Sequence, residues 1–227
     1  MNFNIPTQYY EYRTYLMRHG EEKNYIDMLQ TWLKAAQNRG YNFKVLGPFK
    51  TILGQENEVS YFFIWDSLAQ MEREWVEIYK DKELLEVGLP WWEAEERKGP
   101  KMVQVNSELL RAITDNNDVV YRKGQIYEYR VYNFKTSEAH RLRTDGMANF
   151  FAFTEKHGFT KVGPFVPKFG CENDFSYLFV WDSLLERERA MESLAGDPDL
   201  DASSWYEREQ EEGPLRRSCI SKLMKAV

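Results

Sequence analysis

The sequence predicts an α+β fold in which two tandem ferredoxin-like (split βαβ) units pack antiparallel sheet against antiparallel sheet. First, four motifs recur in the same order at offsets of 114 to 117 residues. Second, the periodicity of each half predicts the order β-α-β-β-α-β. Third, the strands are too apolar to leave either sheet face in water. The motifs are Tyr10-Glu11-Tyr12-Arg13 and Tyr127-Glu128-Tyr129-Arg130, Gly47-Pro48-Phe49 and Gly163-Pro164-Phe165, Trp65-Asp66-Ser67-Leu68 and Trp181-Asp182-Ser183-Leu184, and Gly99-Pro100 and Gly213-Pro214.

The first half opens with a strand and a helix. Residues 8–17 are rich in tyrosine, which favours a strand. Residues 20–38 predict a helix, because their apolar side chains recur at helical spacing and acidic residues occupy the first turn. Residues 43–53 predict a second strand, broken or bent at its Gly-Pro pair. An aromatic and β-branched run over residues 59–65 predicts a third strand that is buried on both faces.

The second helix of each half has a sharp predicted start. Ser67 is followed three residues later by Gln70, and Ser183 is followed in the same way by Glu186. Both pairs fit the capping box, in which a serine and a Glu or Gln satisfy the free N–H groups of the first turn. The same signal in both halves predicts that each helix begins at its serine.

The end of each half is less regular. Residues 82–97 predict an additional helix, interrupted by Pro90. Residues 102–105 predict the fourth strand, whose extension towards Ile113 stays open. The second half repeats the pattern and ends in a strand near residues 217–223. We expect a first unit over residues 1–113, a polar linker over 114–124 and a second unit over 125–227.

Composition excludes several classes of function. The net charge is −6, so a nucleic-acid partner or an anionic membrane surface is disfavoured. The sequence contains no run of 18 apolar residues, so it predicts no membrane span. With only two cysteines and no secretory pattern in the first twenty residues, we expect a cytoplasmic protein. Aromatic residues make up 15% of the chain, enough to build a core and also line a pocket for a small molecule.

The chain resembles the NIPSNAP family in three features. These are the Tyr-Glu-Tyr-Arg-x-Tyr pattern of the first strand, the Asn-Glu or Asn-Asp turn before the third, and Trp-Asp-Ser-Leu at the second helix. Gly196-Asp197-Pro198 also resembles that family's loop after the second helix. The resemblance implies the dimeric α+β barrel superfamily, here as a pseudo-dimeric α+β barrel made within one chain. It implies a monomer with an internal pseudo-dimer, and further homodimerisation stays open.

The superfamily implied by this resemblance includes monooxygenases, isomerases, haem enzymes and proteins with no known reaction. Fold alone therefore does not decide the activity.

Two charged pairs are the main candidates for chemistry. Glu11 and Arg13 share one face of the first strand, as do Glu128 and Arg130 in the second half. One interpretation is a structural ion pair, which could cross between the halves, because buried charges are usually paired. The other is an arginine that holds a carboxylate, phenolate or enolate, with the glutamate as base or as positioner of the arginine.

Aromatic residues are candidates for binding a substrate between sheet and helices. Tyr15 continues the face of Arg13, and Tyr132 that of Arg130, whereas the other tyrosines of these strands point the other way. For Trp65 and Trp181, which occupy matching positions in the two halves, core packing is the alternative. For Trp91 and Trp92, whose counterparts are about Trp205 and Tyr206, the alternative is packing at the sheet edge. The candidate substrate-binding residues are Tyr12, Tyr129, Tyr15, Trp65, Trp181, Trp91 and Trp92.

The sequence predicts no metal site. His19, His140 and His157 lack the spacing of metal ligands. His140 is the residue that could ligate a haem, although we expect no cofactor, and His157 at a helix C-terminus fits the helix dipole. Cys171 and Cys219 belong to elements on opposite sides of the sheet, so we expect no disulfide.

Three functions follow as hypotheses. The first is a cofactor-independent isomerase, lyase or monooxygenase that acts on a small aromatic or apolar substrate by proton transfer, isomerisation or oxygenation. Arg13 or Arg130 would stabilise negative charge, the neighbouring glutamate would position that arginine or move a proton, and a tyrosine or His19 would orient the substrate. The second is a small-molecule binding protein without catalysis. The third is an interaction protein whose cavities are filled by its own side chains.

Overall fold

The computed structural model describes residues 8–114, 121–170, 172–200, 209 and 213–227. It divides into two compact units. We call residues 8–111 together with Val227 the N-terminal unit, and residues 112–226 the C-terminal unit. Most of the predicted linker lies outside the described residues, as do Cys171, Trp205 and Tyr206.

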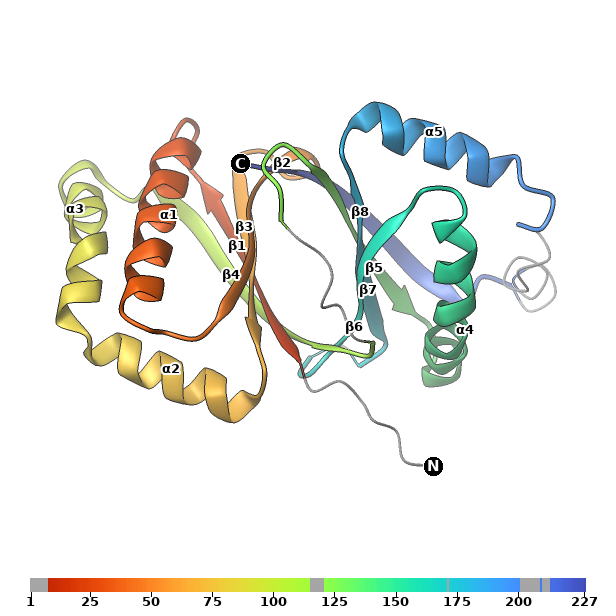
Figure 1. The fold of residues 1–227 in the computed structure, drawn as a ribbon, viewed down its shortest axis with the longest axis horizontal. Helices are drawn as coiled ribbons and strands as arrows, with labels where there is room; N and C mark the ends of the chain where they lie inside the picture. Colours follow the sequence, from red (N-terminus) through yellow and green to blue (C-terminus); the bar gives the residue numbers. More distant parts are fainter. Residues whose placement is uncertain (1–7, 115–120, 171, 201–208, 210–212) are drawn as a thin grey trace. The chain divides into compact units, whose positions relative to one another are not determined.

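The N-terminal unit has a four-stranded antiparallel sheet in the order β4-β1-β3-β2. Helices α1, α2 and α3 lie on one face of this sheet (Figure 1). The elements are β1 (Tyr9–Met17), α1 (Glu22–Asn38), β2 (Lys44–Leu53), β3 (Glu58–Trp65), α2 (Leu68–Lys80), α3 (Lys82–Lys98) and β4 (Met102–Ala112).

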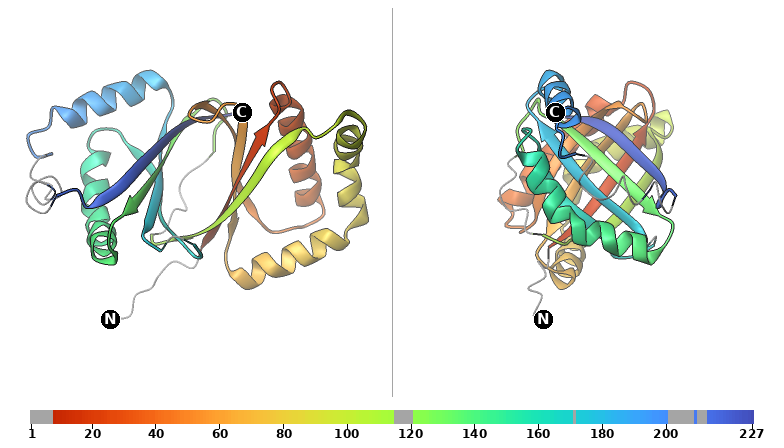
Figure 2. Two further views of the ribbon diagram at one scale, coloured as in Figure 1. Left: turned by 180° about the vertical axis from the view of Figure 1, so that it is seen from behind. Right: turned by 90° about the vertical axis from the view of Figure 1, so that its right-hand side faces the viewer.

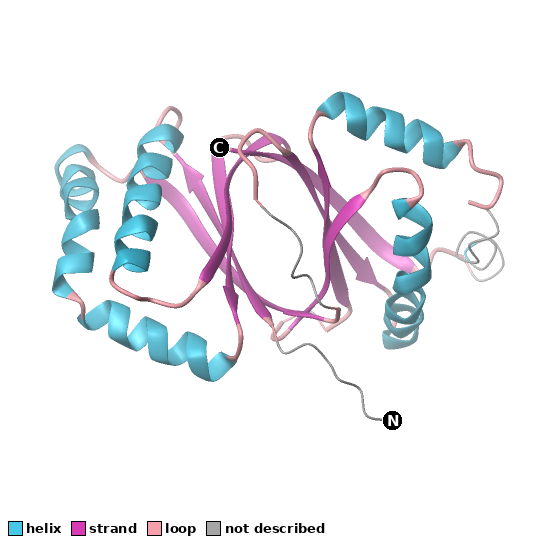
Figure 3. Cartoon of the chain, in the orientation of Figure 1, coloured by secondary structure: helices cyan, strands magenta, loops and turns pink. Residues whose placement is uncertain are grey.

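The C-terminal unit repeats this arrangement in the order β8-β5-β7-β6. Helices α4 and α5 lie on one face of this sheet (Figures 2 and 3). The elements are β5 (Ile126–Phe134), α4 (Ser137–Glu155), β6 (Thr160–Pro167), β7 (Asp174–Trp181), α5 (Leu184–Ala195) and β8 (Arg216–Ala226). Among the described helices, none is long and apolar enough to cross a membrane.

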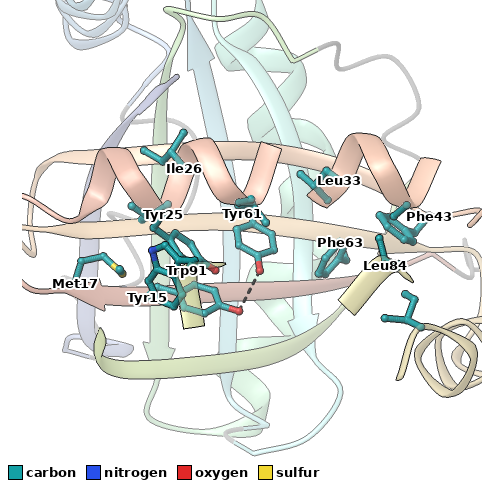
Figure 4. Close-up of a cluster of buried hydrophobic side chains, with 14 of the residues drawn as sticks. Tyr15, Met17, Tyr25, Ile26, Leu33, Phe43, Tyr61, Phe63, Leu84 and Trp91 are labelled. Carbon is teal, nitrogen blue, oxygen red and sulfur yellow. Dashed lines mark hydrogen bonds between the residues drawn. The ribbon is translucent and has the colours of Figure 1, made fainter. Parts of the chain in front are cut away.

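Alternation along β1 decides which side chains meet the helices. Tyr15 packs in the core between sheet and helices, and Arg13 contacts the α2 residue Trp75, whereas Tyr12 stacks on Phe62 on the other side. The pairing of Arg13 with Tyr61 of β3 brings a second tyrosine to the helix side. Figure 4 shows this core with Tyr15, Tyr25 and Tyr61 at its centre.

The bends predicted at the two Gly-Pro pairs are confirmed. The register of β2 with β3 shifts between Leu46 and Phe49, and that of β6 with β7 shifts between Val162 and Phe165. Each bend has a glycine at positive φ, and at Gly47 a Cβ atom would lie 2.7 Å from Tyr61 of the adjacent strand, where it would not fit.

The end of the first half settles one open point and corrects one prediction. The fourth strand does extend beyond residues 102–105, because β4 pairs with β1 from Met102 to Arg111. The predicted interruption at Pro90 is absent, since α3 is one continuous helix. Burial of Leu84 and Trp91 in the core of this unit offsets the backbone hydrogen bond that Pro90 cannot make.

Both predicted capping serines are confirmed. The Oγ atom of Ser67 accepts a hydrogen bond from the backbone N–H of Gln70 at 3.1 Å. Ser183 accepts one from Glu186 at the same distance. Helices α2 and α5 therefore begin where the sequence predicts, which fixes the helix that carries Trp75 against the sheet.

Ser67→Ala and Ser183→Ala are each expected to lower the free energy of unfolding by about 1 kcal/mol, because each leaves an N–H of the first turn without its acceptor. Urea denaturation of the two variants and the parent measures this loss. A loss below about 0.3 kcal/mol in both variants would show that water replaces the serines at little cost.

Candidate functional site

A pocket of about 310 Å³ lies between the sheet and the helices of the N-terminal unit. Its walls come from β1, β3 and β4 on one side and from α1, α2 and α3 on the other. Aromatic and aliphatic side chains dominate this wall, and Arg13 is the charged residue in it. The lining residues are Arg13, Tyr15, Tyr25, Met28, Leu29, Trp32, Tyr61, Phe63, Trp75, Ile78, Tyr79, Leu85, Gly88, Trp92, Met102 and Val105.

Arg13 is held from two sides. Its Nε atom donates to Glu11 Oε1 at 2.7 Å, and its Nη1 atom donates to the Tyr15 hydroxyl at 3.3 Å. The guanidinium carbon lies 4.7 Å from the ring centre of Trp75. Burial disfavours the charged form, but Glu11, Tyr15 and Tyr61 together outweigh burial and raise the pKa of Arg13 above its usual range. Arg13 is therefore a fixed, permanently charged donor in an apolar wall.

Glu11 is almost fully buried, and both of its carboxylate oxygens are used. Oε1 accepts from Arg13 and, at 3.2 Å, from the Ser107 hydroxyl. Oε2 accepts from the Trp75 indole N–H at 3.2 Å. A carboxylate with these three donors is poorly placed to take a proton from a substrate, so the geometry makes Glu11 the residue that orients Arg13.

A group of phenols lies next to Arg13. The Tyr61 hydroxyl donates to the Tyr15 oxygen at 3.0 Å (Figure 4), and the rings of Tyr15 and Tyr25 have centres 4.7 Å apart. Burial raises the pKa of Tyr25 and Tyr61 well above the usual value, so both phenols stay protonated at neutral pH. Because the Tyr15 oxygen already accepts from Arg13 and Tyr61, its own O–H can donate to a ligand.

The rim of the pocket is aromatic and exposed. Tyr79 of α2 is 66% exposed, and Trp92 of α3 is 45% exposed. Trp91, in contrast, is buried with its ring centre 5.6 Å from that of Tyr25. The pair predicted from the sequence is thus divided: Trp91 supports the inner wall, and Trp92 forms part of the rim.

The C-terminal unit contains the same pair in a different charge environment. Arg130 Nε donates to Glu128 Oε1 at 2.8 Å, but Glu128 Oε2 accepts from a second arginine, Arg187, at 2.7 Å. Arg187 thus occupies the role that the indole of Trp75 has in the first unit. Burial disfavours the ionised form of Glu128, but the hydrogen bond from Arg187 and the charge of Arg130 lower its pKa. One carboxylate is therefore shared by two cations.

The structure corrects several sequence-based placements. Each glutamate pairs with the arginine two residues along its own strand, so these pairs do not cross between the halves. His19 is exposed in the turn after β1 and does not line the pocket, because β1 ends two residues before it.

Tyr12 and Tyr129 lie on strand faces opposite to Arg13 and Arg130, because side chains alternate along a strand, so they are not in this pocket.

The matched tryptophans are packed in the two cores. Trp65 is fully buried against Phe43 and Phe63 and does not line the pocket. Trp181 packs against Phe159 and Phe179 of the C-terminal unit and also lines a groove of about 1000 Å³ in that unit. These contacts agree with the alternative interpretation of both residues as core.

The remaining candidates lie apart from Arg13. The His140 ring lies against Phe134 and Phe175, with centres 6.0 and 6.4 Å away, and burial lowers its pKa. Cys219 is exposed and unbridged. Within the described part of the chain, no three His, Cys, Asp or Glu side chains gather as a metal site.

Sequence reasoning missed the residues that complete the site. Trp75 contacts both Arg13 and Glu11, and Tyr25 and Tyr61 complete the group of phenols. Tyr25 was recognised only as part of the apolar face of a helix. Tyr61 lies two residues from both Val59 and Phe63 in an almost unbroken apolar run, so the pattern there does not reveal which side chains face the helices.

The family can now be assigned. The NIPSNAP family model matches residues 10–113 and again residues 127–218. The chain belongs to the NIPSNAP family. No curated protein matches the sequence significantly. The NIPSNAP assignment thus confirms, in both halves, the resemblance found in the sequence motifs.

Solved structures similar to this NIPSNAP chain share its fold at low identity. A "Putative monooxygenase" from Fusobacterium nucleatum is 8% identical, with a TM-score of 0.67 over 97% of this chain and 92% of that one. Another putative monooxygenase, from Lactobacillus acidophilus, has 8% identity and a TM-score of 0.63, covering 96% of this chain and 93% of that one. An "anthrone oxidase-like protein" has 13% identity and a TM-score of 0.58, covering 97% and 92%. The predicted fold class, an α+β barrel of two tandem ferredoxin-like units, is confirmed.

Proposed function

We propose that the N-terminal unit binds a small aromatic molecule that carries one acidic oxygen, and that it oxygenates this molecule without a cofactor. The observation that carries the proposal is Arg13, oriented by Glu11 and placed beside the Tyr15 hydroxyl in an aromatic pocket. A phenolate or enolate oxygen beside Arg13 would receive a charge-assisted hydrogen bond and a second one from Tyr15. The flat rings of the wall would hold the rest of the molecule.

The chemistry follows from stabilising this anion. Binding beside a fixed cation makes the enolate form of the substrate more favourable, which concentrates electron density on the ring carbon that reacts. The anion can then donate electrons to O₂ and form a carbon–oxygen bond. Uptake of a proton and loss of water convert a CH₂ group to a carbonyl, so one oxygen atom enters the product and the other leaves as water. The substrate is the only reductant in this scheme.

Two further observations support the proposal. The lining residues include an arginine and several phenols but no carboxylate or imidazole, which favours a substrate acidic enough to ionise without a strong protein base. The similar structures described as a "Putative monooxygenase" and as an "anthrone oxidase-like protein" have names that fit oxygenation of an aromatic substrate. At their low identity they supply the class of reaction to test.

A second candidate is binding without chemistry. The same lack of a base among the lining residues favours it, because proton transfer or isomerisation usually needs a positioned base. In this case Arg13 and Tyr15 would hold the acidic oxygen and the ligand would leave unchanged. The open pocket disfavours the third hypothesis for this unit, in which its own side chains fill the interior.

Arg13→Met is expected to weaken binding of anthrone at least about tenfold and to reduce its oxidation accordingly, because the variant removes the cation that faces the enolate. Quenching of tryptophan fluorescence measures binding, since Trp75 and Trp92 line the pocket. An oxygen electrode and the absorbance of the product measure oxidation. One O₂ consumed per anthrone supports the enzyme, and saturable binding without O₂ uptake supports the binding protein.

Arg130→Met is the matched control. It removes the corresponding arginine of the C-terminal unit and deprives the buried Glu128 of that partner. The variant should therefore be less stable, but its N-terminal pocket should be unaffected. If anthrone binding survives in Arg13→Met, or falls equally in both variants, the pocket beside Arg13 is not the site.

A further inference from the structure

A second, larger groove lies in the C-terminal unit, with a volume of about 1000 Å³. It is lined by the turn after α4, by the end of β7 and by one side of α5. In contrast to the aromatic pocket of the N-terminal unit, its wall is largely polar and carries charges of both signs. The polar lining residues include Arg122, Lys156, Arg189, Asp182, Glu186, His157 and Ser193. The groove thus contains a hydroxyl and an imidazole.

These two side chains are in direct contact. His157 Nδ1 lies 2.8 Å from Ser193 Oγ, although the residues are 36 positions apart in the sequence. On its other side, His157 Nε2 lies 2.9 Å from Asp197 Oδ2. This second contact lacks the alignment of a hydrogen bond, so it acts through charge. Ser193 and Asp197 are four residues apart, which places both on the side of α5 and its C-terminal end that faces His157.

The ring of His157 is fixed in this position. Its side chain is 10% exposed, and its centre lies 5.3 Å from that of Phe153 in an edge-to-face contact. Ser193, in contrast, is exposed. With the proton of neutral imidazole on Nε2, beside the Asp197 carboxylate, Nδ1 is free to accept the proton of Ser193. An exposed hydroxyl bonded to a partly buried, oriented base is the arrangement that nucleophilic catalysis requires.

We propose that Ser193 is a nucleophile for carboxylic esters, with His157 as its base. Ser193 Oγ attacks the ester carbonyl carbon while its proton moves to His157 Nδ1. The bond to the leaving alcohol then breaks, and that oxygen takes the proton from Nδ1. Water attacks the acyl-serine by the same route in reverse, which releases the carboxylic acid and restores the hydroxyl.

Neighbouring residues can stabilise the charges that form during this reaction, and the groove can hold the substrate. The imidazolium that forms during each step is stabilised by the Asp197 carboxylate 2.9 Å away. The carbonyl oxygen becomes negative in the tetrahedral state, and Lys156 and Arg189 bring positive charge to the same groove. The groove is large enough for a drug-sized ester. This activity is separate from the one proposed for the N-terminal pocket and does not depend on it.

Labelling of the full chain with a fluorophosphonate probe, followed by mass spectrometry of its peptides, tests the proposal. We expect one adduct per chain, on Ser193, and hydrolysis of p-nitrophenyl acetate that is lost in Ser193→Ala. His157→Gln should slow both labelling and hydrolysis about a hundredfold, because it removes the base. Ser137→Ala is the control and should behave like the parent, since the Ser137 hydroxyl contacts Asn173 and no histidine.

Two results would overturn the proposal. One is the absence of a Ser193 adduct in the parent protein, a measurement that needs no variant to fold. The other is labelling that proceeds at the parental rate in His157→Gln. A purely structural role of the contact predicts the first result, together with a lower melting temperature of Ser193→Ala and unchanged hydrolysis of the ester.

Discussion

Replacing Glu128 by alanine is expected to lower the free energy of unfolding by about 3 kcal/mol, because it leaves two arginines without their shared counter-ion. Glu128 is fully buried and bonds to Arg130, Arg187 and the Ser221 hydroxyl. The arginine side chains keep 23% and 27% of their area exposed, so water recovers part of the loss. Urea denaturation followed by circular dichroism measures the difference.

Glu11→Ala is the matched control in the other unit. It frees one arginine and the N–H of Trp75, so we expect a smaller loss of about 2 kcal/mol. The prediction thus concerns the order of the two variants as well as their size. Equal losses, or a loss below about 1 kcal/mol in Glu128→Ala, would mean that Arg130 and Arg187 turn to solvent without penalty.

The same carboxylate makes stability depend on pH. The arginines lower the pKa of Glu128 in the folded state below that of the unfolded chain, which is about 4.3. Its contribution is therefore fully present above pH 4.3 and is lost as the pH falls through the lower, folded pKa. Glu128→Gln should flatten the acid side of the stability curve, whereas the parent should lose stability there. Melting temperatures between pH 6 and pH 3 would show the difference.

Gly47→Ala is expected to destabilise the N-terminal unit by about 3 kcal/mol through strain and overlap. Gly47 has a φ of +126°, which residues with a side chain rarely adopt. A Cβ atom there would lie 2.7 Å from Tyr61 Cβ and 3.0 Å from Tyr61 Cα, so the backbone of β3 would have to move. Because Tyr61 lines the pocket, binding of an aromatic ligand should weaken as well.

Two other glycines provide graded controls. At Gly163 the nearest atoms to a new Cβ are carbons of the Phe165 ring at 3.0 and 3.1 Å, and a ring can shift more easily than a backbone. At Gly40 the φ is +87° but nothing lies within 4 Å, so only the strain remains, about 1 kcal/mol. Thermal unfolding should rank the variants Gly47→Ala, Gly163→Ala, Gly40→Ala from most to least destabilised. A parental melting temperature for Gly47→Ala would contradict the close approach.

Much of the fold could be predicted because its signals are local. The caps at Ser67 and Ser183 depend on residues three positions apart, and the bend at Gly47 depends on an adjacent pair. Because the motifs recur in both halves, each of these predictions could be made independently in each half. The extent of β4 could not be predicted in this way, because the polar residues 106–108 interrupt its apolar pattern and join the strand by pairing with β1.

The site was predicted in part, for the same reason. Alternation along β1 placed Arg13 and Tyr15 on one face and Tyr12 on the other, but it did not show which face meets the helices. Trp75 joins Arg13 only because α2 crosses the sheet at that point, which no local pattern encodes. The contact of His157 with Ser193 likewise depends on how the end of α4 meets α5. Non-local packing therefore decides the chemistry that a local pattern leaves open.

The second partner of the buried glutamate, Trp75 in one half and Arg187 in the other, has a consequence for how such a protein can change over time. A symmetric homodimer encodes both of its copies in one stretch of gene, so every mutation appears in both. In a fused chain, each half can mutate independently of the other. One half can therefore have a neutral indole at the position where the other half has a cation. One half is then free to acquire new ligand preferences while the other keeps its ancestral role.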